Sequence, residues 1–324
     1  MLTLVTGAAG HVGANLVREL LARGRTVRVM VKSDTRGFDG LPVERVAGDI
    51  TQPETLEPAF AGVSVCFHAA AFISVDGRDH KDLYRVNIEG TRNVVAACRK
   101  AGAKLVHFSS IHALSEFPLD QPVDETRPLA IEDGTLAYSR TKAVGEQVVL
   151  DAATDGLDAV ILNPTGIVGP HDYKLSHMGE TVRDLAAGKL PALIPGAYDF
   201  VDVRDVVAGA LAAEEKGRRG ERYVVSGHYV TVRELAESVH RVTGRKPPRM
   251  TCPMWLARLV APPVTWFSLM AGVRPKFTSS SLAVLRSNGR TTFAKAKREL
   301  GYEPRPLDET VAATVEWLRG AKFL

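Results

Sequence analysis

A tyrosine and a lysine lie one helical turn apart in the segment Tyr138-Ser139-Arg140-Thr141-Lys142. Residues at i and i+4 share one face of a helix, so the phenol and the ammonium can meet. The positive charge favours the phenolate and lowers the pKa of the phenol from about 10, towards a range useful for general acid–base catalysis. The pair can therefore exchange a proton with an alcohol, although many exposed helices carry the same two residues without any chemistry.

Two further polar side chains, Ser110 and His112, follow an apolar run that ends at Ser109, which predicts a loop at the end of a strand. A serine hydroxyl there can hydrogen-bond to a carbonyl oxygen and stabilise charge on it. His112 either touches the substrate and assists proton transfer or is an ordinary loop residue. Tyr173, in a loop after Gly169-Pro170, is another candidate substrate contact. The histidines near it are spaced too irregularly to predict a metal site, and none is expected.

Three glycines with the spacing G-x-x-G-x-x-G lie between the first predicted strand and the first predicted helix. Glycines there permit a tight turn and a close approach of the backbone to a pyrophosphate, and the helix N-terminus adds N–H groups and a positive dipole. Similar turns also occur at strand-to-helix junctions that bind nothing, and the commoner spacing is G-x-G-x-x-G. The turn predicts a dinucleotide site formed by Gly7, Ala9, Gly10, His11, Val12 and Gly13.

The end of the second predicted strand indicates which nicotinamide dinucleotide binds. In such sites an acidic residue binds a bare ribose, whereas a basic residue accommodates a 2′-phosphate. Lys32 occupies this position and Arg36 follows it, so we expect NADP(H) to be favoured over NAD(H). The alternative is that Lys32 is merely solvated and that Asp34 binds the ribose.

Two more segments are expected to contact the cofactor. Asp49 and Ile50 follow the third strand, where a carboxylate can accept a hydrogen bond from the adenine amino group or can simply begin a helix. Ala69, Ala70 and Ala71 end the fourth strand. Their small side chains would let the phosphate and ribose lie close to the backbone, although tight core packing explains three alanines equally well.

The segments that position these residues alternate between strand and helix. Continuous apolar runs predict strands buried on both faces, and helical spacing predicts the helices between them. Repeated βαβ units indicate an α/β fold, a doubly wound parallel sheet of the Rossmann kind. The predicted strands are 2–6, 27–31, 43–47, 63–68, 105–109 and 159–162, and the clearest predicted helices are 83–101 and 136–150.

The second half of the chain predicts a smaller lobe, because prolines and glycines become frequent from about residue 165. We expect a dinucleotide-binding domain at 1–165, to which the chain returns at about 198–215, and a smaller mixed α/β substrate lobe at 166–324. The apolar segment 252–273 either walls an apolar pocket or packs in the lobe's own core. Arg258 and Pro262-Pro263 argue against a membrane span, while peripheral association stays open. Short elements are expected at 223–226, 231–243, 281–285, 294–300 and 307–318.

Composition disfavours several other classes of protein. The 324 residues are 45% hydrophobic and 24% charged, as in ordinary globular chains. The net charge is only +4 and the basic residues form short, scattered clusters, so no nucleic-acid partner is expected. Three cysteines without C-x-x-C spacing predict neither disulfides nor a zinc site and fit a cytoplasmic protein. The N-terminus begins as a strand, unlike a signal peptide.

Taken together, seven motifs resemble the extended short-chain dehydrogenase/reductase family, within the NAD-dependent epimerase/dehydratase superfamily. They cover roughly the first 170 residues, and the likeness continues at 200–206. The chain looks most like the dihydroflavonol-4-reductase-like branch, which lies near the 3β-hydroxysteroid dehydrogenases. The motifs are T-G-A-A-G-H-V-G at 6–13, G-D-I at 48–50, H-A-A-A at 68–71, N-I-E-G-T at 87–91, F-S-S at 108–110, Y-S-R-T-K at 138–142 and N-P-T-G-I-V-G-P at 163–170.

The resemblance implies a role for each matching residue. Tyr138 would be the acid/base, Lys142 would bind the nicotinamide ribose and lower the tyrosine pKa, and Ser110 would orient the substrate oxygen. Asn87 would support a proton-relay water or the helix geometry behind the site. Residues 111–115 depart from the V-Y-G ending common in epimerases, which disfavours a sugar-nucleotide substrate. The residues expected beside the nicotinamide ring are Pro164, Gly166 and Ile167.

The predicted reaction is reversible hydride transfer between NAD(P) and a carbonyl or secondary alcohol on an apolar or ring-containing small molecule, such as a dihydroflavonol or a 3β-hydroxysteroid. Two other classes stay open. A sugar-nucleotide epimerase or dehydratase would use the same residues with NAD held permanently. A non-catalytic NADP(H)-binding regulatory protein would turn nothing over, which the complete set of Ser110, Tyr138 and Lys142 argues against. The resemblance also suggests a homodimer through helices 83–101 and 136–150.

Overall fold

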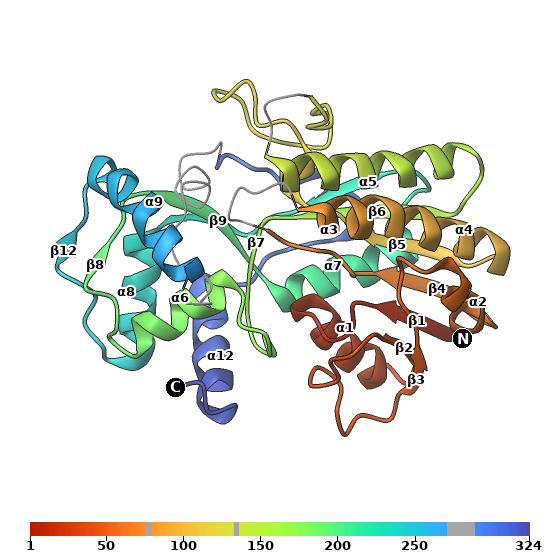
Figure 1. Cartoon of the computed structure of the whole chain (residues 1–324), viewed down its shortest axis with the longest axis horizontal. Helices are drawn as coiled ribbons and strands as arrows, with labels where there is room; N and C mark the ends of the chain where they lie inside the picture. Colours follow the sequence, from red (N-terminus) through yellow and green to blue (C-terminus); the bar gives the residue numbers. More distant parts are fainter. Residues whose placement is uncertain (75–79, 133–135, 271–288) are drawn as a thin grey trace.

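The computed structural model describes residues 1–74, 80–132, 136–270 and 289–324. Its centre is a sheet of seven parallel strands in the order β10-β6-β5-β4-β1-β2-β3 (Figure 1). The strand order reverses between β1 and β4, which is the point where open α/β sheets bind ligands. The strands are β1 (Leu2–Thr6), β2 (Thr26–Val31), β3 (Glu44–Ala47), β4 (Val63–His68), β5 (Lys104–Phe108), β6 (Ala159–Pro164) and β10 (Arg222–Val225).

Helices cover both faces of this sheet, which confirms the predicted doubly wound fold (Figure 1). Alternate residues of one strand enter opposite cores. Val5 belongs to a buried cluster that includes residues of helices α1 (His11–Ala22), α7 (Val203–Lys216) and α11 (Ala294–Leu300). Leu4 belongs to another, which includes residues of α2 (Leu56–Phe60), α4 (Thr91–Ala101) and α5 (Ala137–Thr154). Four short elements complete this part: η1 (Pro53–Thr55), α3 (Lys81–Tyr84), the π-helical η2 (Arg85–Gly90) and η3 (Ile111–Ala113).

The smaller lobe has its own sheets and its own core. Three strands, β7 (Gly166–Val168), β9 (Ala197–Asp202) and β11 (His228–Thr231), form one sheet, and β8 (Ala192–Leu193) pairs with β12 (Met250–Thr251). Val182, Leu235 and Val311 from three helices meet in a buried apolar cluster. The helices are α6 (His177–Ala186), α8 (Val232–Thr243), α9 (Met254–Met270) and α12 (Leu307–Gly320).

The chain returns to the large sheet beyond the segment 198–215. The seventh strand, β10, pairs with β6, and α11 packs on the core beneath it, although both come from residues assigned to the smaller lobe by the sequence pattern. The run Arg222–Val225 is short, and about 60 residues separate it from β6, so apolar pattern alone did not reveal the pairing. The predicted helix at 281–285 lies outside the described residues.

Candidate active site

The predicted site residues lie along one edge of the large sheet, because all seven strands are parallel and their carboxyl ends meet there. The glycine turn follows β1, Lys32 follows β2, the three alanines follow β4 and Ser110 lies two residues beyond β5. Pro164 ends β6, and the chain continues through Thr165 into β7 of the smaller lobe. The predicted site residues therefore lie where the large sheet leads into the smaller lobe.

The glycine turn, which we call the glycine cradle, is packed so closely that Gly7 and Gly13 have no room for a side chain. Gly7 has a φ of 72°, and a Cβ on it would lie 2.6 Å from the backbone of both Ala69 and Ala70. A Cβ on Gly13 would lie 2.2 Å from the Gly7 carbonyl oxygen. Gly10 is the N-cap of α1, and its N–H donates to the Gly7 carbonyl at 2.9 Å. The open turn and the helix N-terminus fit the pyrophosphate of a dinucleotide.

The other residues of this turn contact the loop at 170 and the core. His11 Nε2 lies 3.1 Å from the Pro170 carbonyl oxygen, which joins the first residue of α1 to the chain leaving β7. Ala9 and Val12 pack against the apolar core below the sheet. These contacts hold the turn in shape from both sides.

Beyond the turn, charged side chains gather at the ends of β2 and β3. Lys32 Nζ lies 2.7 Å from Asp49 Oδ2, so the two residues predicted separately for the phosphate and for adenine bind each other. Asp34 pairs with Arg36 at 3.0 Å and with Lys174 at 3.5 Å. The hydrogen bond from Arg36 lowers the pKa of Asp34 to about 2. Three cations face two carboxylates, which leaves a net charge of +1 in this corner.

The segments after β3 and β4, which were also predicted to contact the cofactor, differ in how far their side chains are exposed. Ile50 points into the core, where a Cβ on Gly90 would lie 2.6 Å from its Cδ1, so its side chain is not offered to a ligand. The Ala70 N–H donates a weak hydrogen bond to Thr6 Oγ1 at 3.4 Å, and the Ala69 N–H donates to the Thr6 carbonyl at 3.2 Å. Ala71 is exposed at the sheet edge.

Ser110, Tyr138 and Lys142 converge next to this edge. Ser110 caps η3, and its Oγ accepts a hydrogen bond from the His112 N–H at 3.2 Å. Tyr138 is in the first turn of α5, and Lys142 lies one turn later. The Lys142 ammonium is buried and donates to the Phe108 carbonyl at 2.8 Å, at the end of β5. A hydroxyl, a phenol and an ammonium therefore come from β5 and α5 to one place.

Burial governs the titration of this group. It raises the pKa of Tyr138 above its usual value, and the hydrogen bond with Ser110 opposes this only in part. Burial lowers the pKa of Lys142 to about 8, against the attraction of Glu146. The expectation that Lys142 lowers the tyrosine pKa is wrong for this structure, because desolvation dominates and the ammonium is turned to the Phe108 carbonyl.

Asn87 connects three segments behind the site. Its Oδ1 accepts from the Phe72 N–H at 2.8 Å, and its Nδ2 donates to the Phe72 carbonyl at 3.0 Å and to Thr141 Oγ1 at 3.2 Å. The residue is buried in the π-helical η2. It therefore fixes the chain after β4 against α5, between Tyr138 and Lys142.

The sequence analysis missed Tyr198, which contacts His112. The Tyr198 Oη lies 2.8 Å from His112 Nε2, and the two rings stack with centroids 6.0 Å apart. The His112 ring also meets the Tyr138 ring edge-on at 6.4 Å. Gly166 makes room for this arrangement, since a Cβ there would lie 2.6 Å from Tyr198 Cε1. Gly166, two residues after Pro164, was the signal in the sequence that a bulky side chain lies close to the backbone there.

A second residue that the sequence analysis missed, Glu146, lies fully buried one turn after Lys142. Its Oε2 accepts from Asn163 Nδ2 at 2.6 Å, and Asn163 also donates to the Ser110 carbonyl at 3.1 Å. Arg222 on β10 lies 3.4 Å from Glu146. Burial raises the pKa of Glu146. The spacing of residues 138, 142 and 146 on one helical face could have revealed it.

Two buried histidines lie beneath the edge. The Thr6 hydroxyl is 2.7 Å from His68 Nδ1, the Thr91 hydroxyl is 3.2 Å from His68 Nε2, and the His68 and His107 rings lie 5.2 Å apart. Burial lowers the pKa of His68 to about 3 and that of His107 well below its usual range. Both histidines are neutral at pH 7, so the positive charge beside them is that of Lys142.

Tyr173 is not brought to Ser110 and Tyr138. Its hydroxyl accepts from Arg18 on α1 at 2.8 Å, and its ring contacts His171 and Trp317. It thus joins α1 to α12. The residues expected beside the nicotinamide ring lie on two strands: Pro164 ends β6, and Gly166 and Ile167 begin β7. In the parts of the chain that the structure describes, no three His, Cys, Asp or Glu side chains form a metal-binding group.

The apolar segment at 252–273 includes α9, whose described side chains mostly face outward. Trp255 and Leu259 are 68% and 67% exposed, so they do not fill a core, and that interpretation of the segment is wrong for these two residues. The apolar pocket stays a prediction. Of the α9 side chains that the structure describes, only Ala257 and Ala261 are buried, against Ile194 and Cys252. Among the described residues, no helix is both long and apolar enough to cross a membrane.

Known proteins resemble this chain over its full length. It is 41% identical to "Sterol demethylase protein B" of Methylococcus capsulatus over 98% of both chains. It is 31% identical to "Sterol-4-alpha-carboxylate 3-dehydrogenase, decarboxylating" of Mus musculus, over 96% of this chain and 89% of that protein. The crystal structure of gox2253 superposes with a TM-score of 0.83 and 34% identity, over 99% and 98% of the two chains.

A family model covers the glycine cradle and the group of Ser110, Tyr138 and Lys142. The model of the NAD dependent epimerase/dehydratase family matches residues 3–226, which include the whole candidate site up to β10. The chain therefore belongs to the NAD dependent epimerase/dehydratase family, as an NAD(P)-dependent oxidoreductase of the extended short-chain dehydrogenase/reductase type.

Proposed function

We propose that this protein catalyses reversible hydride transfer between NADP(H) and the carbonyl or secondary alcohol of an apolar, ring-containing molecule. The observation that carries the proposal is the convergence of Ser110, Tyr138 and Lys142 beside an open glycine cradle at the sheet edge. A bound nicotinamide would supply or accept the hydride. The chain's own residues bind and orient the substrate, and they transfer the proton.

Tyr138 is the proposed acid/base. In reduction its phenol gives a proton to the substrate oxygen as that oxygen gains charge, and in oxidation the phenolate takes it back. A protonated phenol suits the first step, and burial keeps Tyr138 protonated at pH 7. Ser110, beside Tyr138, donates a hydrogen bond to the same oxygen.

Lys142 is the proposed cation of the site. Its pKa of about 8 leaves it mostly protonated near pH 7. It is held at the Phe108 carbonyl, where a neighbouring ribose hydroxyl would accept one of its remaining N–H donors. Asn87 positions the helix that carries both Tyr138 and Lys142, through Thr141.

The preference for NADP(H) is supported by the charges after β2. Lys32, Arg36 and Lys174 outnumber Asp34 and Asp49, so the corner attracts a 2′-phosphate. Lys32 is 62% exposed and can turn from Asp49 to a phosphate. The loss of the Lys32–Asp49 ion pair is the cost of that rearrangement.

The proposed substrate is a sterol-like fused-ring ketone or alcohol. Two full-length relatives carry sterol in their names, and one of them is named as a 3-dehydrogenase. We keep the cytoplasm as the proposed compartment, supported by three cysteines that form no disulfide. A homodimer through α4 and α5 stays a prediction from the resemblance.

The test is the consumption of NADPH with 3-ketosteroids, aromatic ketones and aliphatic ketones, in wild type and in Tyr138→Phe. We expect turnover to fall by about 100-fold or more in the variant while NADPH still binds, because one hydroxyl is lost from the reacting centre only. Near-normal turnover by the variant would refute the role of Tyr138. NAD that co-purifies with the chain, together with isomerisation of a sugar nucleotide, would favour an epimerase instead.

A further inference from the structure

One surface of the smaller lobe is apolar and open. Five side chains of α9, together with Met250 on β12, are exposed, and we call these six residues the apolar face. Trp255, Leu259 and Met270 follow one another along the outer side of the helix, and each is about two-thirds exposed. Among the described side chains of the helix, Ala257 and Ala261 are buried, and the partly buried Met254 packs against them. The apolar face consists of Met250, Trp255, Leu259, Val260, Val264 and Met270.

Basic side chains lie close to the apolar face in the sequence. Four residues, Arg245, Lys246, Arg249 and Arg258, are exposed beside it, and we call them the basic rim. Among the described residues none of the four forms an ion pair, whereas the nearby Arg241 pairs with Asp308 at 2.6 Å. The sequence contains no Asp or Glu between Glu237 and Glu299, where about seven would be expected from 37 acids in 324 residues.

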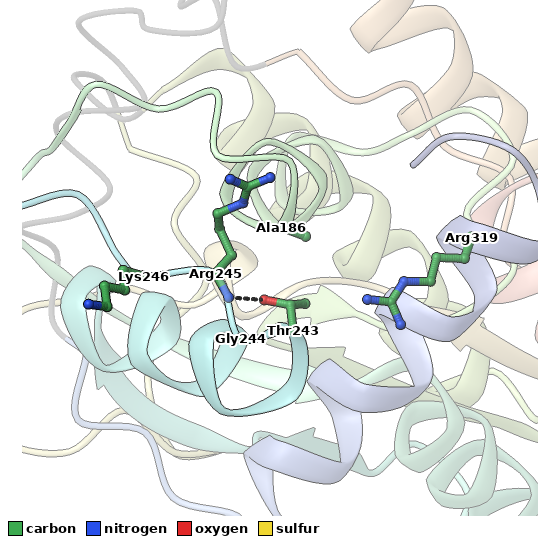
Figure 2. A pocket seen from close by; sticks show the side chains of 6 residues that line it. All are labelled: Ala186, Thr243, Gly244, Arg245, Lys246 and Arg319. Atoms are coloured by element: carbon green, nitrogen blue, oxygen red, sulfur yellow. Dashed lines mark hydrogen bonds between the residues drawn. The ribbon is translucent and has the colours of Figure 1, made fainter.

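A hollow beside the rim adds to this positive surface (Figure 2). It measures about 680 Å³ and is lined by Arg245, Lys246 and Arg319, with Thr243 and Ala186 between them. In Figure 2 the side chains of Arg245, Lys246 and Arg319 come from different sides, from the end of α8 and from α12. Basic residues at a helix C-terminus complement its dipole, but this effect ends within one turn and explains neither Arg249 nor Arg258.

The prolines in α9 indicate that the helix lies on a surface and does not cross it. Pro262 and Pro263 have no N–H, so the carbonyls of Arg258 and Leu259 lack their helical partners. In hydrocarbon such carbonyls would remain unsatisfied, whereas water at the headgroups can bind them. A surface helix with exposed apolar side chains, an exposed Trp and basic residues nearby suits the membrane interface.

We propose that the apolar face and the basic rim form a docking surface for the headgroup region of an anionic lipid bilayer. Figure 1 shows β12, β8 and the start of α9 at one end of the long axis of the molecule, away from the large sheet. A bilayer can meet this end without covering the edge that holds Ser110 and Tyr138. Charge complementarity favours anionic lipid over a second copy of this surface, because two copies would bring the same uncompensated cations together.

The size of the effect follows from the two parts of the surface. Each basic residue near an anionic surface strengthens binding about fivefold, so reversal of two charges lowers the partition coefficient by at least about 25-fold. Loss of two large apolar side chains lowers the partition coefficient at least about tenfold on any bilayer, because their burial at the acyl boundary supplies the rest of the binding free energy.

The experiment is co-sedimentation of the full chain with vesicles of phosphatidylcholine alone or mixed with phosphatidylglycerol, at low and high salt. We expect wild type to sediment with the mixed vesicles, less so at high salt. Trp255→Ser/Leu259→Ser should lose binding to both vesicles, and Lys246→Glu/Arg249→Glu should lose the preference for phosphatidylglycerol. Matched controls are Leu119→Ser, an exposed leucine elsewhere, and Lys100→Glu, an exposed lysine on α4. Circular dichroism checks the fold of every variant.

Two results would overturn the proposal. Wild type that stays in the supernatant with both vesicles has no bilayer-docking surface, and this outcome depends on no variant. If sedimentation equilibrium shows a wild-type dimer that Trp255→Ser/Leu259→Ser dissolves while vesicles are ignored, the apolar face belongs to a second copy. Neither result would bear on the hydride transfer proposed above, which is measured with a dissolved ketone.

Discussion

The phenolic oxygen of Tyr198 lies 2.8 Å from Nε2 of His112 and thereby joins β9 of the smaller lobe to the loop that carries Ser110. Burial lowers the pKa of His112 to about 4, so the imidazole is neutral at pH 7 and one ring nitrogen can accept the tyrosine proton. The backbone N–H of the same His112 donates to Ser110 Oγ at 3.2 Å. Tyr198 is thus a positioning residue for the serine hydroxyl.

Tyr198→Phe should therefore lower kcat/KM for the carbonyl substrate about tenfold, since one hydrogen bond to a buried partner is lost and His112 is free to move. The Kd for NADPH should stay unchanged, because Tyr198 is on β9 of the smaller lobe, whereas the glycine cradle follows β1 of the large sheet. Stopped-flow turnover and cofactor titration measure the two quantities. Tyr229→Phe on β11, an exposed tyrosine of the same lobe, is the control. Equal kcat/KM in Tyr198→Phe and wild type would contradict the positioning role.

Local pattern predicted the parts of the site that lie close together in the chain. The turn of Gly7 and Gly13 follows β1 directly, and Tyr138 and Lys142 are fixed to one face by helical periodicity. The carboxyl ends of parallel strands then meet by geometry, which brings Ser110 to the same edge.

Contacts between distant segments could not be predicted in this way. Tyr198 and His112 are 86 residues apart, and Arg222 reaches Glu146 from a strand whose place in the sheet depends on tertiary pairing. The position of Tyr173 in a loop predicted a substrate contact, whereas in the structure its hydroxyl accepts a hydrogen bond from Arg18 on α1. The direction of the Tyr138 pKa shift could not be predicted from the sequence either, because burial and not sequence spacing decides it.

The glycine cradle can be tested by a steric substitution with a matched control. Gly7→Ala places a Cβ 2.6 Å from the backbone of Ala69 and Ala70, so the turn must open and NADPH binding should fall by at least tenfold. Gly24→Ala has a similar φ of 71° but no atom within 4 Å of its Cβ. It should cost only about 1 kcal/mol of folding free energy and leave the Kd unchanged. Equal effects of the two substitutions on the Kd would rule out the close approach as the cause.

The choice between dinucleotides can be tested at Lys32. Lys32→Ala should weaken NADPH binding about tenfold and leave NADH binding within about twofold, because only NADPH carries the 2′-phosphate. Asp49→Asn should have the opposite sign for NADPH, since it releases Lys32 from its 2.7 Å ion pair. Isothermal titration with both cofactors measures the ratio. If Lys32→Ala changes both affinities alike, Lys32 does not read the phosphate.

The buried ammonium of Lys142 predicts a pH dependence of stability. Burial lowers its pKa from 10.5 to about 8 in the folded chain, so between these values the unfolded chain binds more protons than the folded one. Stability from this group therefore rises as the pH increases from about 8 to 10.5, and it is lost as the pH falls through about 8. In Lys142→Met this contribution is absent, so the free energy of unfolding of wild type should gain on that of the variant by up to about 3 kcal/mol over the window. Urea unfolding of both proteins across this pH range measures the difference, in which the other titrating groups cancel. A difference that stays constant with pH would mean that the folded state keeps Lys142 at its ordinary pKa.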